Sequence, residues 1–152
     1  MAEVLNPDRP QKLSIVVFSG NYDKVHYALV MASAAAATDT PVTLFFTMEA
    51  SRCMLGHNGD NVGECSWGDQ STSTCTETGA DMDARFKTKG VADFETLLSA
   101  CVEMRVRFLV CEMGLKAMDL KREDLRPDVN FEPGGVVTFL NDAQQDGSVI
   151  FI

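Results

Sequence analysis

A cysteine stands where an apolar stretch of the sequence gives way to polar and helix-forming residues. Residues 105–114 read RVRFLVCEMG, and Cys111 directly follows the apolar residues 108–110. Free cysteine is one of the most often buried residue types, so a core position is one interpretation. The other is a nucleophile at a strand end, because the N–H groups and positive dipole end of a following helix favour a thiolate. Glu112 acts in the opposite direction, since a neighbouring carboxylate disfavours a second negative charge.

The other cysteines point to chemistry less clearly. Cys101 lies on the apolar face of a predicted helix and is expected in the core. Cys53, Cys65 and Cys75 share an irregular section with His57, and the spacing Cys-x3-His-x7-Cys-x9-Cys matches no zinc pattern built on closely paired cysteines. We therefore expect exposed loop thiols without a function, and no metal site.

Strands and helices alternate along the chain. Residues 13–18 and 42–47 are apolar runs rich in β-branched residues, typical of strands covered on both faces, and apolar residues between them recur at helical spacing. Helical spacing returns at 91–101. Further segments are predicted as strands at 107–110, 128–132 and 148–152, helical turns at 112–118 and 121–125, and a helix opened by Pro133-Gly134-Gly135. The pattern predicts an α/β fold, a flavodoxin-like three-layer sandwich with a five-stranded, mainly parallel sheet.

The section from about 49 to 90 interrupts this alternation. It is rich in Gly, Ser, Thr, Asp and Asn and has little apolar periodicity, which favours a short helix near 49–55 followed by a polar loop to about Ala80. We expect one domain spanning 1–152 with this long polar insertion as its most mobile part, because such a composition buries too little apolar surface to offset ordering entropy.

The carboxyl ends of the strands are the expected location of the site, because ligands collect there in open α/β sheets. Cys111 lies at such an end, and Met113 and Met118 are candidates for an apolar wall beside its thiol. His26, in the first predicted helix, is expected to pack or lie at the surface and is not assigned as a base. The residues expected to line a cleft at this edge follow two of the strands: Ser19, Gly20, Asn21, Glu112, Met113 and Gly114.

Composition excludes several classes of protein. Hydrophobic residues make up 45% and charged residues 23% of the chain, as in globular proteins. A net charge of −9 argues against general binding to nucleic acid or to anionic membranes, and no apolar run is long enough to span a bilayer. No nucleotide-binding motif occurs, although residues 133–135 could hold an anion at a helix start. The N-terminus lacks a secretory signal pattern, so we expect a cytoplasmic protein whose five cysteines stay reduced.

Three segments resemble the DsrE/DsrF-like proteins, and specifically the DsrE-like subgroup also labelled peroxiredoxin-family. They are SIVVFSGNYDKVHYALVMASAAAATDTPVTLFFT, FLVCEMGLKAMDLKREDL and GGVVTFLNDAQQDGSVIFI, and the resemblance covers residues 13–48 and 91–152. It implies a flavodoxin-like fold, homo-oligomers, and a strand-end cysteine that accepts sulfane sulfur as a persulfide and passes it to a partner. That role maps onto Cys111. The 49–90 section departs from the family, so its cysteines inherit no role.

Two function hypotheses follow. In the first, Cys111 is the persulfide-forming residue of a sulfurtransferase-like carrier, which needs no cofactor and exchanges sulfur with donor and acceptor proteins or small sulfane-sulfur compounds. In the second, the protein is a non-catalytic oligomeric module that binds a small ligand or a protein, and Cys111 is buried and inert. A peroxide-reducing role with a loop cysteine ranks third.

Overall fold

One parallel sheet organises the computed structural model, which describes residues 4–56 and 66–152. Its five strands lie in the order β4-β3-β2-β1-β5, and every neighbouring pair is parallel. The predicted five-stranded α/β architecture is confirmed. The strands are β1 (Leu13–Val17), β2 (Val42–Phe46), β3 (Arg107–Cys111), β4 (Phe131–Gly134) and β5 (Ser148–Phe151).

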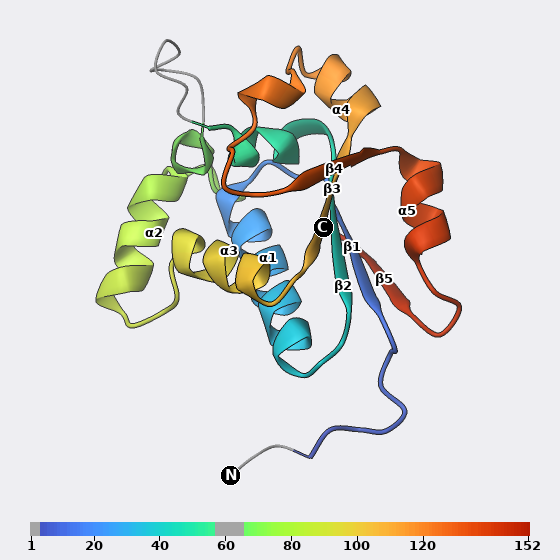
Figure 1. Ribbon diagram of the computed structural model, residues 1–152. Coiled ribbons are helices and arrows are strands. Elements are labelled where there is room, and N and C mark those ends of the chain that lie inside the picture. Colours follow the sequence, from blue (N-terminus) through green and yellow to red (C-terminus); the bar gives the residue numbers. More distant parts are fainter. Residues whose placement is uncertain (1–3, 57–65) are drawn as a thin grey trace.

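Helices cover both faces of the sheet, which gives three layers. The connections from β1 through β4 each step one strand in the same direction, whereas β5 returns to the far side of β1. Because crossovers between parallel strands are right-handed, this reversal places the last helix on the opposite face. Figure 1 shows α1 (Tyr22–Ala37), α2 (Gly79–Thr88) and α3 (Phe94–Glu103) on one side of the sheet and α5 (Val136–Asp142) on the other. None of the helices in the described parts of the chain has the length and apolarity to cross a membrane.

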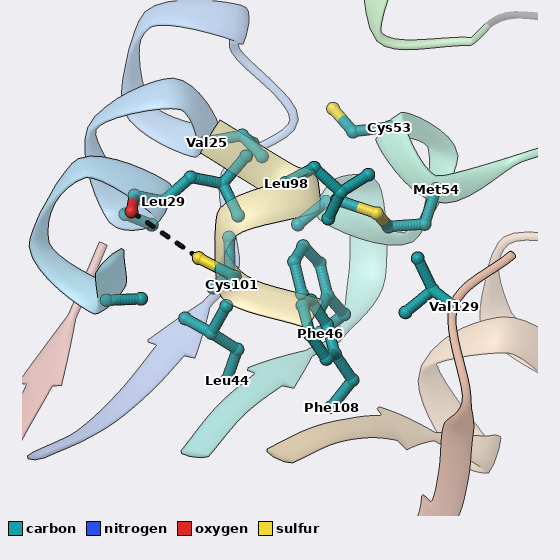
Figure 2. Close-up of a cluster of buried hydrophobic side chains, with 14 of the residues drawn as sticks. Val25, Leu29, Leu44, Phe46, Cys53, Met54, Leu98, Cys101, Phe108 and Val129 are labelled. Carbon is teal, nitrogen blue, oxygen red and sulfur yellow. Dashed lines mark hydrogen bonds between the residues drawn. The ribbon is translucent and has the colours of Figure 1, made fainter. Parts of the chain in front are cut away.

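The larger core lies between the sheet and helices α1 and α3. Alternate strand residues point into it, among them Leu44, Phe46 and Phe108, which lie close to Leu98 and Leu29 from the two helices (Figure 2). The opposite strand residues form a smaller core under α5. That second core consists of Phe45, Leu109, Cys111 and Phe139, with Val16 packed against it.

The end of the sheet differs from the prediction. Residues 133–135 were expected to open a helix, but Pro133 and Gly134 belong to β4, which begins at Phe131 and pairs with β3. β4 is an edge strand, and an edge position tolerates the missing N–H of proline. The helix consequently begins at Val136.

The 49–90 section contains more structure than its composition suggests. The short helix expected near 49–55 is the 3₁₀ segment η1 (Met48–Met54), and it is followed by η2 (Trp67–Asp69) and by α2. Asp83 of α2 is 3% exposed and accepts hydrogen bonds from the Tyr22 hydroxyl at 2.5 Å and the Phe94 N–H at 2.8 Å. The described part of the section is thus fixed to α1 and α3, while residues 57–65 lie outside the described chain.

Candidate functional site around Cys111

Cys111 is the last residue of β3 and the residue that caps α4 (Glu112–Ala117). Its backbone is extended, and its Sγ accepts a hydrogen bond from the N–H of Gly114 at 3.3 Å. The abrupt change from an apolar strand to a helix therefore has a local cause. The cysteine side chain replaces the Ser, Thr or Asp that usually binds a free N–H in the first turn.

The thiol is covered. Cys111 is 1% exposed and belongs to the small core with Phe45, Leu109 and Phe139, where the rings of Phe45 and Phe139 stack at 5.1 Å between centroids. Gly134 is its register partner on β4. The expectation of a thiol in an open cleft is therefore wrong, because α5 packs its single buried aromatic residue onto this face of the sheet.

Gly114 allows α4 to lie close to the end of β2. A Cβ at this position would stand 2.6 Å from Thr47 Oγ1 and 2.8 Å from the Met48 backbone nitrogen, both shorter than real Cβ contacts. Only glycine fits without moving one of the two segments. The same residue donates to Cys111, so tight packing and the hydrogen bond to sulfur depend on one position.

The other two residues after the cysteine point away from the site. Glu112 is exposed, and Met113 is 70% exposed. The proposed apolar wall of Met113 beside the thiol is therefore wrong, because the α4 face that packs inward carries Gly114 and Leu115. Of the three positions predicted to line a cleft here, Gly114 contacts the sulfur.

The loop Ser19-Gly20-Asn21 shares the carboxyl edge of the sheet but stands apart from the thiol. β2 lies between β1 and β3, which separates their ends by two strand spacings, about 10 Å. Gly20 instead packs against Glu49, whose Cβ would be 2.9 Å from a Cβ at position 20. Among the described residues, no hydrogen bond joins this loop to Cys111.

Two other cysteines are buried on the opposite side of the sheet. Burial raises the pKa of Cys101 to about 12, and burial together with the nearby Glu49 raises that of Cys53 to about 12. Figure 2 shows both thiols, with Cys101 directed at the carbonyl oxygen of Leu29 at 3.7 Å. The Cys101 prediction is confirmed. The prediction that Cys53 is an exposed loop thiol is wrong, because η1 turns it into the core.

The direction of the hydrogen bond separates Cys111 from these two thiols. Cys53 Sγ donates to the Gly20 carbonyl at 3.5 Å, and Cys101 Sγ donates to a carbonyl as well, so both bonds require the protonated thiol. Cys111 Sγ instead accepts an N–H, so its hydrogen bond does not use the proton of the thiol. The hydrogen bond that Cys111 accepts thus distinguishes it from the two thiols that donate to carbonyl oxygens.

Two further described candidates, Cys75 and His26, do not join the site. Cys75 is exposed, and Cys65 and His57 lie outside the described residues. His26 is buried in the layer on the other face of the sheet, with Nε2 2.8 Å from the Ala92 carbonyl oxygen, so it is a packing residue and no base for Cys111. In residues 4–56 and 66–152, no three His, Cys, Asp or Glu side chains come together as a metal site would need.

Sequence reasoning missed three residues of the site. Thr47 limits how closely α4 approaches, Gly134 leaves the neighbouring position on β4 without a side chain, and Phe139 covers the sulfur from α5. The pair Gly134-Gly135 after a proline was the available signal. It indicated a helix start but not the register that brings Gly134 beside Cys111.

Comparison with known proteins gives consistent matches over nearly the whole chain. The model of the DsrE/DsrF/DrsH-like family matches residues 9–151. The uncharacterized protein YrkE of Bacillus subtilis (strain 168) is 26% identical over 166 aligned positions, covering 95% of this chain and 99% of YrkE. The sulfur carrier protein DsrE2 of Allochromatium vinosum is also 26% identical, over 163 positions that cover 93% of this chain and 98% of DsrE2.

Proposed function

Because the chain belongs to the DsrE/DsrF/DrsH-like family, we propose that it is a sulfur carrier in which Cys111 holds sulfane sulfur as a persulfide. A relative named as a sulfur carrier supports a role in sulfur relay. The observation that carries the assignment to Cys111 is the hydrogen bond that its Sγ accepts from the N–H of Gly114. The thiols of Cys53 and Cys101 instead donate to carbonyl oxygens.

The transfer is an exchange between sulfur atoms without a net redox change. The Cys111 thiolate attacks the outer sulfur of a donor persulfide R–S–SH, a new Sγ–S bond forms as the S–S bond of the donor breaks, and the donor leaves as the thiolate R–S⁻. The acceptor thiolate then attacks the outer sulfur of Cys111–S–SH, which breaks the Sγ–S bond and returns Cys111 to the thiolate. Atoms and charge balance in both steps, and no metal or organic cofactor takes part. The donor is a small sulfane-sulfur compound or a protein persulfide, and the acceptor is the thiol of a protein or of a small molecule.

The apolar surroundings of Cys111 suit a carried persulfide. Phe45, Leu109 and Phe139 exclude water and free thiols from the sulfur while it is held. Loading and release then require that α5 or α4 move away from the strand end. Both helices are short, with seven and six residues, and lie at the lower end of helix stability. All four described cysteines are unpaired, which fits the reducing cytoplasm.

The burial of Cys111 also favours the second function, a non-catalytic oligomeric module that binds a small ligand or a protein. In that case the 1% exposed thiol is a core residue with no access to a sulfur donor. The two functions differ in whether the native protein ever opens at Cys111.

Alkylation of the native protein, read by peptide mapping, separates the two functions. Cys75 is exposed and reacts in either case, so the comparison is among the three buried thiols. The carrier predicts that Cys111 is alkylated well before Cys53 and Cys101, both of which remain protected until the protein unfolds. If Cys111 is protected as long as those two, the binding module replaces the carrier.

A further inference from the structure

Two short helices, α4 and α5, border Cys111, and they are attached to the protein in different ways. Leu115 of α4 is 3% exposed and belongs to the larger core, and Gly114 packs directly against the residues after β2. The last turn of α4 is also fixed, because the guanidinium group of Arg52 in η1 donates to the Met118 carbonyl oxygen at 3.3 Å. α4 is therefore attached to the body of the protein along its whole length.

The packing of α5 against the protein is much smaller. Phe139 is the one buried residue of this helix, and its other large apolar side chains, Val136, Val137 and Leu140, are between 51% and 71% exposed. Figure 1 shows α5 on its own side of the sheet, without another helix of the described chain beside it. Apolar packing thus fixes α5 through a single ring, which lies in the small core with Cys111.

A second attachment holds the last turn of α5. Asp142 is the last residue of the helix and its only charged one. One of its carboxylate oxygens lies 2.7 Å from Lys12 Nζ and 2.6 Å from Thr43 Oγ1, and the other lies 2.5 Å from a guanidinium nitrogen. That guanidinium group belongs to Arg107. Because the three partners precede β1 or belong to β2 and β3, one side chain joins α5 to three strands.

The second attachment lies far from the thiol. β3 runs from Arg107 to Cys111, and this separation of four residues spans about 13 Å in a parallel strand. Asp142 binds the first of these residues, whereas Phe139, one turn earlier in α5, packs with the last. Asp142 therefore acts on the thiol only through the position of α5. The strands on either side of α5 in the chain are paired independently of it, β4 with β3 and β5 with β1.

We propose that α5 is the gate to Cys111 and that Asp142 is the positioning residue that keeps this gate closed. The inference rests on the proposed function, because a sulfur carrier must expose its thiol. When the contacts of Asp142 break, the Phe139 ring alone holds α5, and lifting the helix withdraws that ring from the small core. Cys111 is then accessible, while α4 stays in place and the Gly114 N–H remains on the sulfur.

Alkylation of the native protein by iodoacetamide at one fixed pH, read by peptide mapping, tests the gate. Asp142→Asn weakens the attachment of α5, and Arg52→Gln weakens that of α4. Asp83→Ala is the matched control, because it removes another buried, hydrogen-bonded carboxylate on the opposite side of the sheet. The measured quantity is the alkylation rate of Cys111, and unfolding in urea gives the loss of stability in each variant.

We expect Cys111 to react at least about tenfold faster in Asp142→Asn, because the closed gate loses contacts that the open gate does not make. Asp83→Ala should be less stable than the wild type, yet its Cys111 should react within about twofold of the wild-type rate, as should that of Arg52→Gln. An unchanged rate in Asp142→Asn overturns the proposal. So does an equal increase in Asp83→Ala, which means that unfolding exposes the thiol, or in Arg52→Gln, which means that α4 is the gate.

Hydrogen exchange tests the gate in the wild type, without a substitution. The backbone amides of 139–143 in α5 and the thiol of Cys111 should give the same opening free energy, because one movement exposes both, and the amides of 116–118 in α4 should give a higher one. If the α4 amides open together with Cys111 while those of α5 stay protected, the proposal is wrong.

Sulfur loading from polysulfide separates the gate from the carrier. If Cys111 is alkylated faster in Asp142→Asn but neither this variant nor the wild type gains sulfur, the gate stands and the sulfur carrier is wrong. If the wild type loads sulfur on Cys111 and Asp142→Asn leaves the alkylation rate unchanged, the carrier stands and the gate is wrong.

Discussion

The backbone N–H of Gly114 points at Cys111 Sγ from a distance of 3.3 Å, and the absence of a side chain at Gly114 lets α4 lie close to Thr47 and Met48. One glycine therefore sets both how closely α4 packs on residues 47–48 and which hydrogen bond the sulfur receives. The cysteine is a helix cap in the resting protein and, in the proposed function, the carrier of sulfur.

Gly114→Ala should destabilise the protein and slow sulfur loading. The added methyl group would come within 2.6 Å of Thr47 Oγ1 and 2.8 Å of the Met48 nitrogen, so α4 must move away from the strand end. Overpacking of this kind costs about 1–3 kcal/mol in the free energy of unfolding, measured in urea. Gly135→Ala is the control, because a Cβ there meets nothing within 4 Å. Equal effects of the two substitutions would contradict the packing role of Gly114.

Cys101→Ser and Cys53→Ser should each lower the stability by about 1–3 kcal/mol without affecting sulfur loading. Both positions are fully buried, and a hydroxyl group is more costly to desolvate than a thiol. Cys75→Ser, at an exposed position, should change the free energy of unfolding by less than about 0.5 kcal/mol. If a folded Cys53→Ser or Cys101→Ser protein no longer loads sulfur, that cysteine takes part in sulfur transfer, and the conclusion drawn from its hydrogen bond is wrong.

Asp142 should make the protein sensitive to acid. Burial raises its pKa, but hydrogen bonds from Lys12, Thr43 and Arg107 outweigh this effect and hold the pKa below its usual value. A carboxyl group with a lowered folded-state pKa stabilises the fold above its unfolded value of about 4, and this contribution is lost as the pH falls through the folded value. Melting temperatures should therefore fall steeply below about pH 4.

Asp142→Asn tests whether the carboxyl group of Asp142 causes the acid sensitivity. The variant leaves the Lys12 ammonium group, whose side chain is 10% exposed, without its carboxylate, so it should be less stable at neutral pH by about 3 kcal/mol. Its stability should also fall less steeply below pH 4 than that of the wild type. Asp146→Asn, at an exposed position before β5, should keep the wild-type profile. An unchanged acid profile in Asp142→Asn would locate the sensitivity elsewhere.

Asp83→Ala should release α2 from the body of the protein. The substitution leaves the Tyr22 hydroxyl and the Phe94 N–H without the carboxylate that accepts both, at a cost of about 2 kcal/mol or more. Limited proteolysis should then cut within 79–88 sooner than in the wild type. Asp81→Ala, which removes only the exposed cap of the same helix, should have the smaller effect. If Asp81→Ala speeds proteolysis more than Asp83→Ala does, the cap, and not Asp83, holds α2 in place.

The sequence predicted the elements whose signal is apolar periodicity. Strands β1, β2, β3 and β5 and helices α1 and α3 follow from such patterns, and the location of Cys111 at a strand end follows with them. Helix α2 was not predicted, because polar contacts stabilise it. Thr78 and Asp81 cap it reciprocally, and the buried Asp83 fixes it to Tyr22.

Burial at the candidate site could not be predicted from local sequence. Cys53 follows a polar stretch, and only the turn of η1 directs it into the core. Cys111 is covered by Phe139, which is 28 residues away in the sequence and reaches it through the crossover of α5. Long-range packing of this kind leaves no periodic signal near the cysteine itself.

Intact mass spectrometry after exposure to polysulfide, with peptide mapping of the added sulfur, tests the central claim most directly. The wild type should gain the mass of one sulfur atom on the peptide that contains Cys111, and a small acceptor thiol should remove it. Cys111→Ser should fold and gain none, while Cys53→Ser, Cys65→Ser and Cys75→Ser should each load as the wild type does. If the folded Cys111→Ser protein gains sulfur at the wild-type rate, Cys111 is not the carrier.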